Sequence, residues 1–227
     1  MDSSELIPNL ADLEASIKRR EDTDAVLSFP KWFILSLITL GIVWVYVLYK
    51  LIKRRNEHFK RQIRVMEHIE SIIKAVSEKR DVDITLDFTK MSRASRDVRD
   101  EETEKSAVLW VILTFVTGIA GLYIYYFLTK DVYTHSRRQS DFFEGCKGAL
   151  STLGISTTGI STATRDQYQV PKRSFALYII LTVITLGIFG IYWVYIIFKD
   201  WNEHFKTQWR LEDEILTVMK SLTQQIE

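Results

Sequence analysis

Three histidines occupy the same place in three related stretches of the sequence. His58, His135 and His204 each follow an apolar segment and stand five residues after a lysine. Neutral imidazole is a common metal ligand, and three imidazoles with an open fourth position are one arrangement that binds zinc. If the three stretches pack with threefold pseudosymmetry, these imidazoles converge and could hold one ion. Descent from a common repeat, with hydrogen bonding at an interface, is the simpler interpretation, and on that basis we expect no metal and no other cofactor.

No other set of residues indicates catalysis. The sequence has no glycine-rich phosphate loop, no H-E-x-x-H and no recognisable arrangement of serine, histidine and aspartate. The middle of each apolar segment lacks Asp, Glu, His and Arg, which disfavours a pump or a coupled transporter. The formal net charge of +1 gives the chain no strong attraction for nucleic acid, and the single cysteine, Cys146, excludes an intramolecular disulfide. We therefore predict that the protein is not an enzyme.

The histidines belong to an internal repeat. Residues 28–64 and 174–210 align without a gap at an offset of 146 and share 19 identities in 37 positions. A weaker copy, residues 106–139, shares the pattern G-I-x-x-x-Y-x-x-Y-x-x-x-K followed by the histidine. Such self-similarity predicts three copies of one structural unit.

The stretch T-L-G-I-F-G-I-Y-W at 185–193 resembles the signature of a family of small, uncharacterised prokaryotic membrane proteins. That domain of unknown function carries a T-L-G-I-Y-x-[IL]-Y-W motif. The resemblance covers the three apolar segments and their C-terminal flanks. The first two copies depart from the motif, since Trp44 replaces the second glycine and Thr-Gly replaces Thr-Leu-Gly. The resemblance implies a membrane location and brings no activity.

The three copies share an apolar segment of about 22–25 residues, long enough as a straight helix to cross a ~30 Å hydrocarbon core. We therefore expect an all-α integral membrane protein with three repeated apolar helical segments and amphipathic cytoplasmic extensions. The segments are either spanning helices or re-entrant hairpins. Every copy has the same basic C-terminal flank, which places all three flanks on one side and favours hairpins. Gly41, Gly118 and Gly187 are the expected hinges, and Thr39 and Thr185 the expected caps of the freed backbone groups.

Aromatic and basic residues follow each hinge. Their tyrosines are paired at i, i+3, so each pair shares a helix face, and the lysine beyond them is placed to meet lipid phosphate. The pattern is typical of an interfacial aromatic belt. The expected lipid-interface residues are Trp44, Tyr46, Tyr49, Lys53, Tyr123, Tyr126, Lys130, Tyr192, Trp193, Tyr195 and Lys199.

The sequence divides at these copies. We expect an N-terminal amphipathic and polar segment (1–27), repeat 1 (28–80), a polar linker (81–105), repeat 2 (106–147), a Gly/Ser/Thr-rich linker or short strand pair (148–173) and repeat 3 (174–227). Apolar stripes at helical spacing continue beyond the first and third segments, from Phe59 to Val76 and from Phe205 to Leu222. They predict association of subunits through helices; the alternatives are packing within one chain and helices that lie on the lipid headgroups.

These observations favour a non-enzymatic, oligomeric protein of the cell membrane whose soluble parts are mainly cytoplasmic. Its hairpins would insert into the lipid bilayer and organise or shape it, and its helices would join copies into a homo-oligomeric scaffold. The alternatives are an accessory subunit of a larger membrane complex and a small channel or transport protein with three spanning helices.

Overall fold

The structure is a computed structural model that describes residues 6–160 and 170–225. Throughout these residues the regular secondary structure is helical, as expected. No strand forms in the described parts of 148–173, and residues 161–169 of that stretch lie outside the described residues. The helices are α1 (Leu6–Lys18), α2 (Arg20–Thr23), α3 (Phe29–Ile38), α4 (Ile42–Arg80), α5 (Thr85–Glu101), α6 (Ala107–Thr117), α7 (Ala120–Thr152), α9 (Phe175–Ile184) and α10 (Ile188–Gln224).

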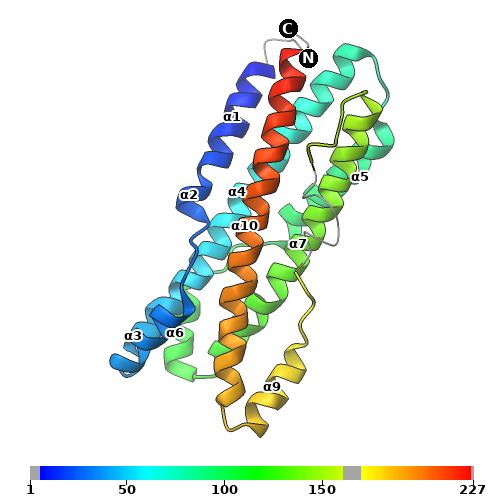
Figure 1. The fold of residues 1–227 in the computed structure, drawn as a ribbon. Helices are drawn as coiled ribbons and strands as arrows, with labels where there is room; N and C mark the ends of the chain where they lie inside the picture. Colours follow the sequence, from blue (N-terminus) through cyan, green and yellow to red (C-terminus); the bar gives the residue numbers. More distant parts are fainter. Residues whose placement is uncertain (1–5, 161–169, 226–227) are drawn as a thin grey trace.

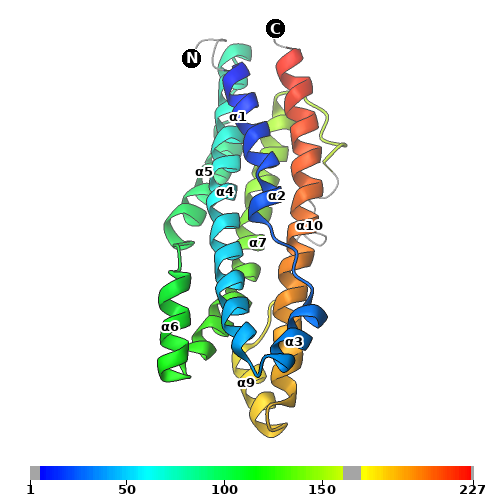
Figure 2. The ribbon, with the colours of Figure 1, turned by 90° about the vertical axis from the view of Figure 1, so that its left-hand side faces the viewer.

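Three helical hairpins organise the molecule. Each joins a short apolar helix to a long one: α3 to α4 (hairpin 1), α6 to α7 (hairpin 2) and α9 to α10 (hairpin 3). The three turns lie at the same end of the molecule, called here the hairpin end (Figures 1 and 2). From there α4, α7 and α10 run parallel to the opposite end, where the described chain begins and ends. This parallel arrangement brings equivalent positions of the hairpins to the same height.

The turns of hairpins 1 and 3 share one backbone geometry. In each, a leucine with φ of 50° precedes a glycine with φ of 89° or 94°, and the glycine N–H donates to the carbonyl five residues earlier at 2.7 or 2.8 Å. The residues concerned are Leu40 and Gly41, and Leu186 and Gly187. Hairpin 2 lacks that leucine, and its Gly118 has φ of 67° and donates four residues back, to Thr114. The chain therefore reverses at the expected hinges, where positive φ favours glycine.

Threonine hydroxyls cap the long helices at these turns. Thr39 Oγ1 accepts from the N–H of Val43 at 3.1 Å, and Thr185 Oγ1 accepts from Phe189 at 2.9 Å. Hairpin 2 uses Thr117 Oγ1 and the N–H of Ala120 at 3.2 Å. Both expected threonine caps are thus present, and they satisfy amide groups that the reversal would leave exposed.

The expected integral membrane protein is contradicted. Within residues 6–160 and 170–225, no helix has both the length and the apolar content needed to pass through a membrane. The physical reason is the reversal at each glycine: an arm of 10 or 11 residues rises only about 15–17 Å, half of a ~30 Å core. The long helices leave the apolar segment within a few turns and continue as charged, amphipathic helices.

Two apolar cores fill the bundle. One, near the hairpin end, contains Leu51, Leu128 and Trp201, and the other, toward the opposite end, contains Met66 and Phe142. The predicted stripes lie mostly inside these cores, so they are covered within one chain. A second copy would therefore need a different surface, and the expected homo-oligomer stays a prediction.

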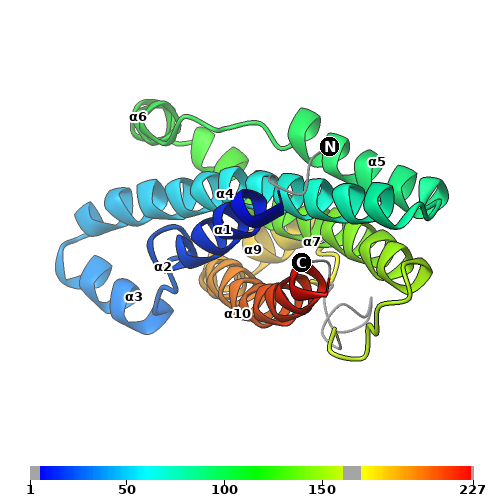
Figure 3. The same ribbon diagram turned by 90° about the horizontal axis from the view of Figure 1, so that it is seen from above.

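Helices α1 and α5 cover the bundle from outside. Seen along the bundle (Figure 3), α1 lies against α4 and α10, while α5 packs against α7 and α4. The segment 81–105, expected as a polar linker, thus contains a packed helix. The close approach of α5 favours glycine at Gly145 on α7, because a Cβ there would lie 2.9 Å from Met91 Cγ and 3.1 Å from the backbone oxygen of Asp87.

Candidate functional site

The three equivalent histidines meet in the middle of the bundle. His58 on α4, His135 on α7 and His204 on α10 are all buried. The Nε2 atom of His58 lies 3.2 Å from Nε2 of His135 and 3.2 Å from Nε2 of His204. One ring nitrogen from each of the three lies within 4.8 Å of the others. The threefold convergence that the repeat made conceivable is therefore present.

Two buried carboxylates hold the outer nitrogens of this layer. Asp24 Oδ1 lies 2.9 Å from His58 Nδ1, and Glu102 Oε2 lies 2.5 Å from His135 Nδ1. Each carboxylate stands four residues before the serine that precedes a short apolar helix, and the third hairpin has Val170 at this place. The repeat did not reveal these carboxylates, because they precede the aligned segments.

Burial controls the protonation of two of these histidines, His58 and His204. It lowers the pKa of His58 to about 4, against the opposing effect of Asp24. Burial also lowers the pKa of His204, and the neighbouring His58 and His135 act in the same direction. His58 and His204 are therefore neutral at pH 7. Burial would raise the pKa of Asp24, but His58 and Arg61 hold it well below its usual range, so Asp24 is ionised.

A second polar layer lies one helical turn beyond the histidines. Gln139 and Gln208 both donate through Nε2 to Gln62 Oε1, at 2.9 and 2.8 Å. Gln62 in turn donates to Glu212 Oε1 at 2.5 Å. These glutamines follow the histidines by four residues on each long helix, so a threefold H-x-x-x-Q pattern in the sequence marks the layer.

Arg61 ties the two layers to the surrounding helices. Its guanidinium donates to Asp24 Oδ2 at 2.6 Å and to Glu212 Oε1 at 2.7 Å, and both carboxylates are buried. Trp209 Nε1 also donates to Asp24 Oδ2 at 2.9 Å. The histidine and glutamine layers thus form one buried polar network between two apolar cores. Buried polar groups are costly unless their hydrogen bonds are satisfied, so such a network needs an explanation.

Two asparagines fix the hairpins around this network. Asn56 Nδ2 donates to the carbonyl of Lys105 at 2.6 Å, and Asn202 Nδ2 donates to the carbonyl of Leu27 at 2.8 Å. Lys105 and Leu27 each directly precede the serine before an apolar helix. Each asparagine therefore holds the start of another hairpin, which positions the adjoining carboxylate.

The expected lipid-interface residues divide into two groups. Tyr46, Tyr123, Tyr192 and Tyr195 are exposed, with Lys53, Lys130 and Lys199 beyond them, while Tyr49 and Tyr126 are half-buried. Each tyrosine pair lies together as the spacing predicted, with ring centroids 5.9–6.4 Å apart.

The two tryptophans in that set depart from the expectation. Trp193 is buried, because its ring packs against Phe175 and its Nε1 donates to Thr129 Oγ1 at 3.0 Å. Trp44 is half-buried and donates to the hydroxyl of Tyr125 at 3.1 Å. Trp193 is therefore a core residue and not a lipid-interface residue.

The hairpin end exposes large apolar side chains from all three hairpins. Leu40 is 95% exposed, Phe115 is 85% exposed and Leu186 is 94% exposed. Their neighbours at the turns are at least 70% exposed: Ile38, Ile42, Val116, Ile119, Ile184 and Ile188. Solvent-exposed apolar groups gathered in this way mark an interaction surface.

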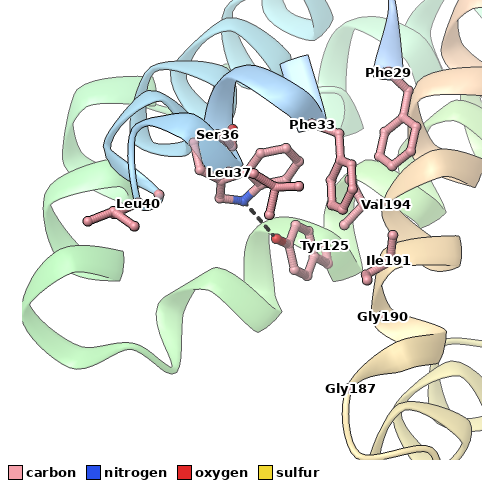
Figure 4. A pocket seen from close by; sticks show the side chains of 12 residues that line it. Phe29, Phe33, Ser36, Leu37, Leu40, Tyr125, Gly187, Gly190, Ile191 and Val194 are labelled. Atoms are coloured by element: carbon pink, nitrogen blue, oxygen red, sulfur yellow. Dashed lines mark hydrogen bonds between the residues drawn. The ribbon is translucent and has the colours of Figure 1, made fainter. Parts of the chain in front are cut away.

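An apolar pocket of about 570 Å³ opens at this end between hairpins 1 and 3. Figure 4 shows the side chains of Phe33 and Tyr125 facing those of Ile191 and Val194 across it, with the Trp44–Tyr125 hydrogen bond on one side. The sequence alone does not reveal this pocket, because its wall combines residues from both hairpins and from α7.

Comparison with known proteins gives one match. Residues 173–222, which form most of hairpin 3, match a domain of unknown function, DUF4234. A comparison with curated proteins finds no match to the chain, and a comparison with solved structures finds none either.

Proposed function

We propose that this chain is a non-enzymatic protein that attaches to the surface of a lipid bilayer through its hairpin end and organises that surface. The single observation that carries the proposal is the exposure of Leu40, Phe115 and Leu186 at the tips of three hairpins that point the same way. Burying one such side chain in an apolar medium is worth roughly 1.5–3 kcal/mol. Three tips acting together give stable attachment.

The attachment is to one face of the bilayer. Apolar tips of this kind enter about 5–10 Å into the boundary between headgroups and acyl chains. Such contact is compatible with short arms, because no helix has to cross and the turn amides are already capped by threonine. Insertion of three wedges into one leaflet expands that leaflet, which is the physical basis for organising or bending it.

Exposed lysines that follow the tyrosine pairs support a lipid surface with anionic headgroups. Lys53, Lys130 and Lys199 are exposed just beyond the tyrosines, one on each long helix. A lysine near an anionic membrane surface contributes about 1 kcal/mol. Lys53 and Lys199 lie 3.5 and 3.8 Å from Glu57 and Glu203, and exposed pairs of this kind are weak enough to exchange for lipid phosphate.

The apolar pocket adds a place for lipid. Its wall of Phe29, Phe33, Ile191 and Val194 faces the same end as the tips and offers an acyl chain an apolar surface. We also propose that hairpins 1 and 2 are further copies of the unit of unknown function matched by hairpin 3. Their shared turn glycines, tyrosine pairs, lysines and histidines support this view.

Vesicle co-sedimentation tests the proposal. The wild-type chain should sediment with vesicles of mixed zwitterionic and anionic lipid, and the variant Leu40→Glu/Phe115→Glu/Leu186→Glu should lose most of that binding. The matched control is Leu86→Glu, since Leu86 is 74% exposed and is the second residue of α5, which begins near the end of the bundle opposite the hairpin end. Replacing Lys53, Lys130 and Lys199 by Gln should weaken binding to anionic vesicles more than to neutral ones.

Two results would count against attachment to lipid. Wild-type protein with native circular dichroism that stays in the supernatant would reject it. Unchanged binding of the triple glutamate variant would reject the hairpin end as the contact surface. If the wild type ignores lipid but co-purifies with a membrane protein only when its tips are intact, the function is that of an accessory subunit.

A further inference from the structure

We propose that His58, His135 and His204 bind one divalent transition-metal ion of the zinc class through their Nε2 atoms. This inference goes beyond attachment to lipid and does not depend on it. The site lies inside the bundle, between the two apolar cores, whereas the lipid surface lies at the hairpin end. Each hairpin supplies one ligand.

The spacing of the ligand atoms fits a shared ion. A tetrahedral zinc ion with Zn–N bonds of about 2.0–2.1 Å places its nitrogen ligands about 3.3 Å apart. His58 Nε2 lies 3.2 Å from the Nε2 atoms of both His135 and His204. Ring nitrogens of the third pair, His135 and His204, lie within 4.8 Å of each other, so a small shift of these rings would bring all three nitrogens within reach of one ion.

The tautomers of His58 and His135 leave the Nε2 atoms of both rings without a proton. His58 Nδ1 faces the ionised Asp24 at 2.9 Å and His135 Nδ1 faces Glu102 at 2.5 Å, so we assign the proton of each ring to Nδ1. Both Nε2 atoms then present lone pairs to each other across 3.2 Å. Two facing lone pairs repel, and a cation between them converts that repulsion into coordination.

The carboxylates also complete a second shell typical of metal sites. A histidine ligand commonly donates its other N–H to a carboxylate, which fixes the ring and raises its basicity. Asp24 and Glu102 both do this here, and their negative charges offset that of a divalent ion. The layer thus offers three imidazole ligands, and buried carboxylates contact the rings of His58 and His135.

The surroundings indicate a structural ion. All three histidines are buried, and the rings of Phe59, Trp201 and Phe205 pack against the layer. A tetrahedral zinc ion has four ligands, so the three histidines leave one position open. A water molecule could provide the fourth ligand, and Gln208 Oε1, buried one helical turn away, lacks a hydrogen-bond partner among the described residues and could accept from it. The ion would lock the three hairpins in register.

Metal titration of the full-length chain tests the inference. After treatment with a chelator, the protein should take up one equivalent of Zn²⁺ per chain in competition with a chromophoric chelator, and Zn²⁺ should raise its melting temperature. His58→Asn should abolish this uptake. The matched control is His68→Asn, which changes the remaining histidine, on the same helix and outside the cluster, and should leave uptake unchanged. Glu102→Gln should weaken binding by about 10–100-fold.

A spectroscopic measurement keeps the inference testable if a variant fails to fold. X-ray absorption of the zinc-loaded wild type should show three imidazole ligands. A first shell with oxygen ligands only, or with sulfur, would overturn the assignment. So would folded wild-type protein that binds no Zn²⁺, Co²⁺ or Cu²⁺, or equal loss of uptake in the His58→Asn and His68→Asn variants.

Discussion

Arg61 is the residue on which most of the buried charge depends. It donates to Asp24 and Glu212 at 2.6 and 2.7 Å, and its side chain is almost completely buried with theirs. Arg61→Met removes the cation that contacts both buried carboxylates and leaves Glu212 only the longer pair with Arg20 at 3.8 Å, which should cost about 3–5 kcal/mol of unfolding free energy. Urea denaturation followed by circular dichroism measures this loss.

The matched control for this change is Arg99→Met. Arg99 also forms a short ion pair, at 2.6 Å from Glu67, but both side chains are about half exposed. An exposed pair contributes about 0–1 kcal/mol. Equal losses from the two substitutions would contradict the special role of Arg61.

Cys146 should be inert in the folded protein. It is fully buried, and burial raises the pKa of its thiol to about 12. A raised thiol pKa favours the protonated form, so about one molecule in ten thousand carries the reactive thiolate at pH 8. We expect almost no alkylation by iodoacetamide between pH 7 and pH 9, and rapid alkylation once urea unfolds the chain. Mass spectrometry reads both, and fast labelling of the native protein would show that the core around Cys146 is open.

At the residue scale, the sequence predicted the positions that recur and missed their partners. The repeat placed His58, His135 and His204 at equivalent points, and the parallel helices bring them together. Asp24 and Glu102 could not be found in this way, because they lie 34 and 33 residues before the histidines they contact and outside the aligned segments. Their role depends on how the chain returns along the bundle, which only the three-dimensional structure determines.

At the scale of the element, the turns decide how the apolar segments fold. Gly41→Ala and Gly187→Ala should each lower the unfolding free energy by about 1–2 kcal/mol, because an L side chain is strained at φ near +90°. Nothing lies within 4 Å of a Cβ at either position, so the cost is one of backbone conformation and not of crowding. Thermal or urea unfolding provides the measurement.

Gly159→Ala serves as the control for the turns. Gly159 does not have a positive φ, and a Cβ there meets Val218 at an ordinary 3.9 Å. It should therefore change stability by a few tenths of a kcal/mol at most. If Gly41→Ala leaves the free energy of unfolding unchanged, the turn of hairpin 1 relaxes to another conformation.

The sequence predicted the reversal of each apolar segment better than it predicted the structure of the segment 81–105 between repeats. Equal basic flanks and central glycines favoured a reversal, and the observed turns with their threonine caps agree with it. The polar composition of 81–105 suggested a linker, yet α5 forms because Met91, Ala94 and Val98 share one face that packs on α7. A single narrow apolar face among many charges is easily read as a solvated segment.

At the scale of the whole molecule, apolar length led to the expectation of an integral membrane protein, yet none of the described helices is long and apolar enough to span a membrane. Segments of 22–25 apolar residues satisfy the length rule for spanning, but the glycine turns divide each one into two shorter arms. The apolar residues then divide into two groups. Those on one face of each arm pack into the core near the hairpin end, and those at the tips stay exposed. A hydropathy profile cannot distinguish the buried apolar residues from the exposed ones, because it does not record where the chain reverses.

The exposed tips should make the lipid-free protein associate with itself. In buffer without lipid or detergent, burial of Leu40, Phe115 and Leu186 between copies removes apolar surface from water, so the wild type should form concentration-dependent assemblies. The variant Leu40→Glu/Phe115→Glu/Leu186→Glu should shift toward the mass of one chain, 26.6 kDa, in sedimentation velocity. The Leu86→Glu control should assemble as the wild type does.

The outcome also separates two origins of an oligomer. Association through the tips must compete with lipid, so adding vesicles or mild detergent should dissolve wild-type assemblies. An oligomer of fixed size that survives both detergent and the triple substitution would instead use a surface of the long helices away from the hairpin end. Such an oligomer would support the scaffold predicted from the sequence. Its copies would be joined through their helices, and all hairpin ends would stay free to contact one membrane.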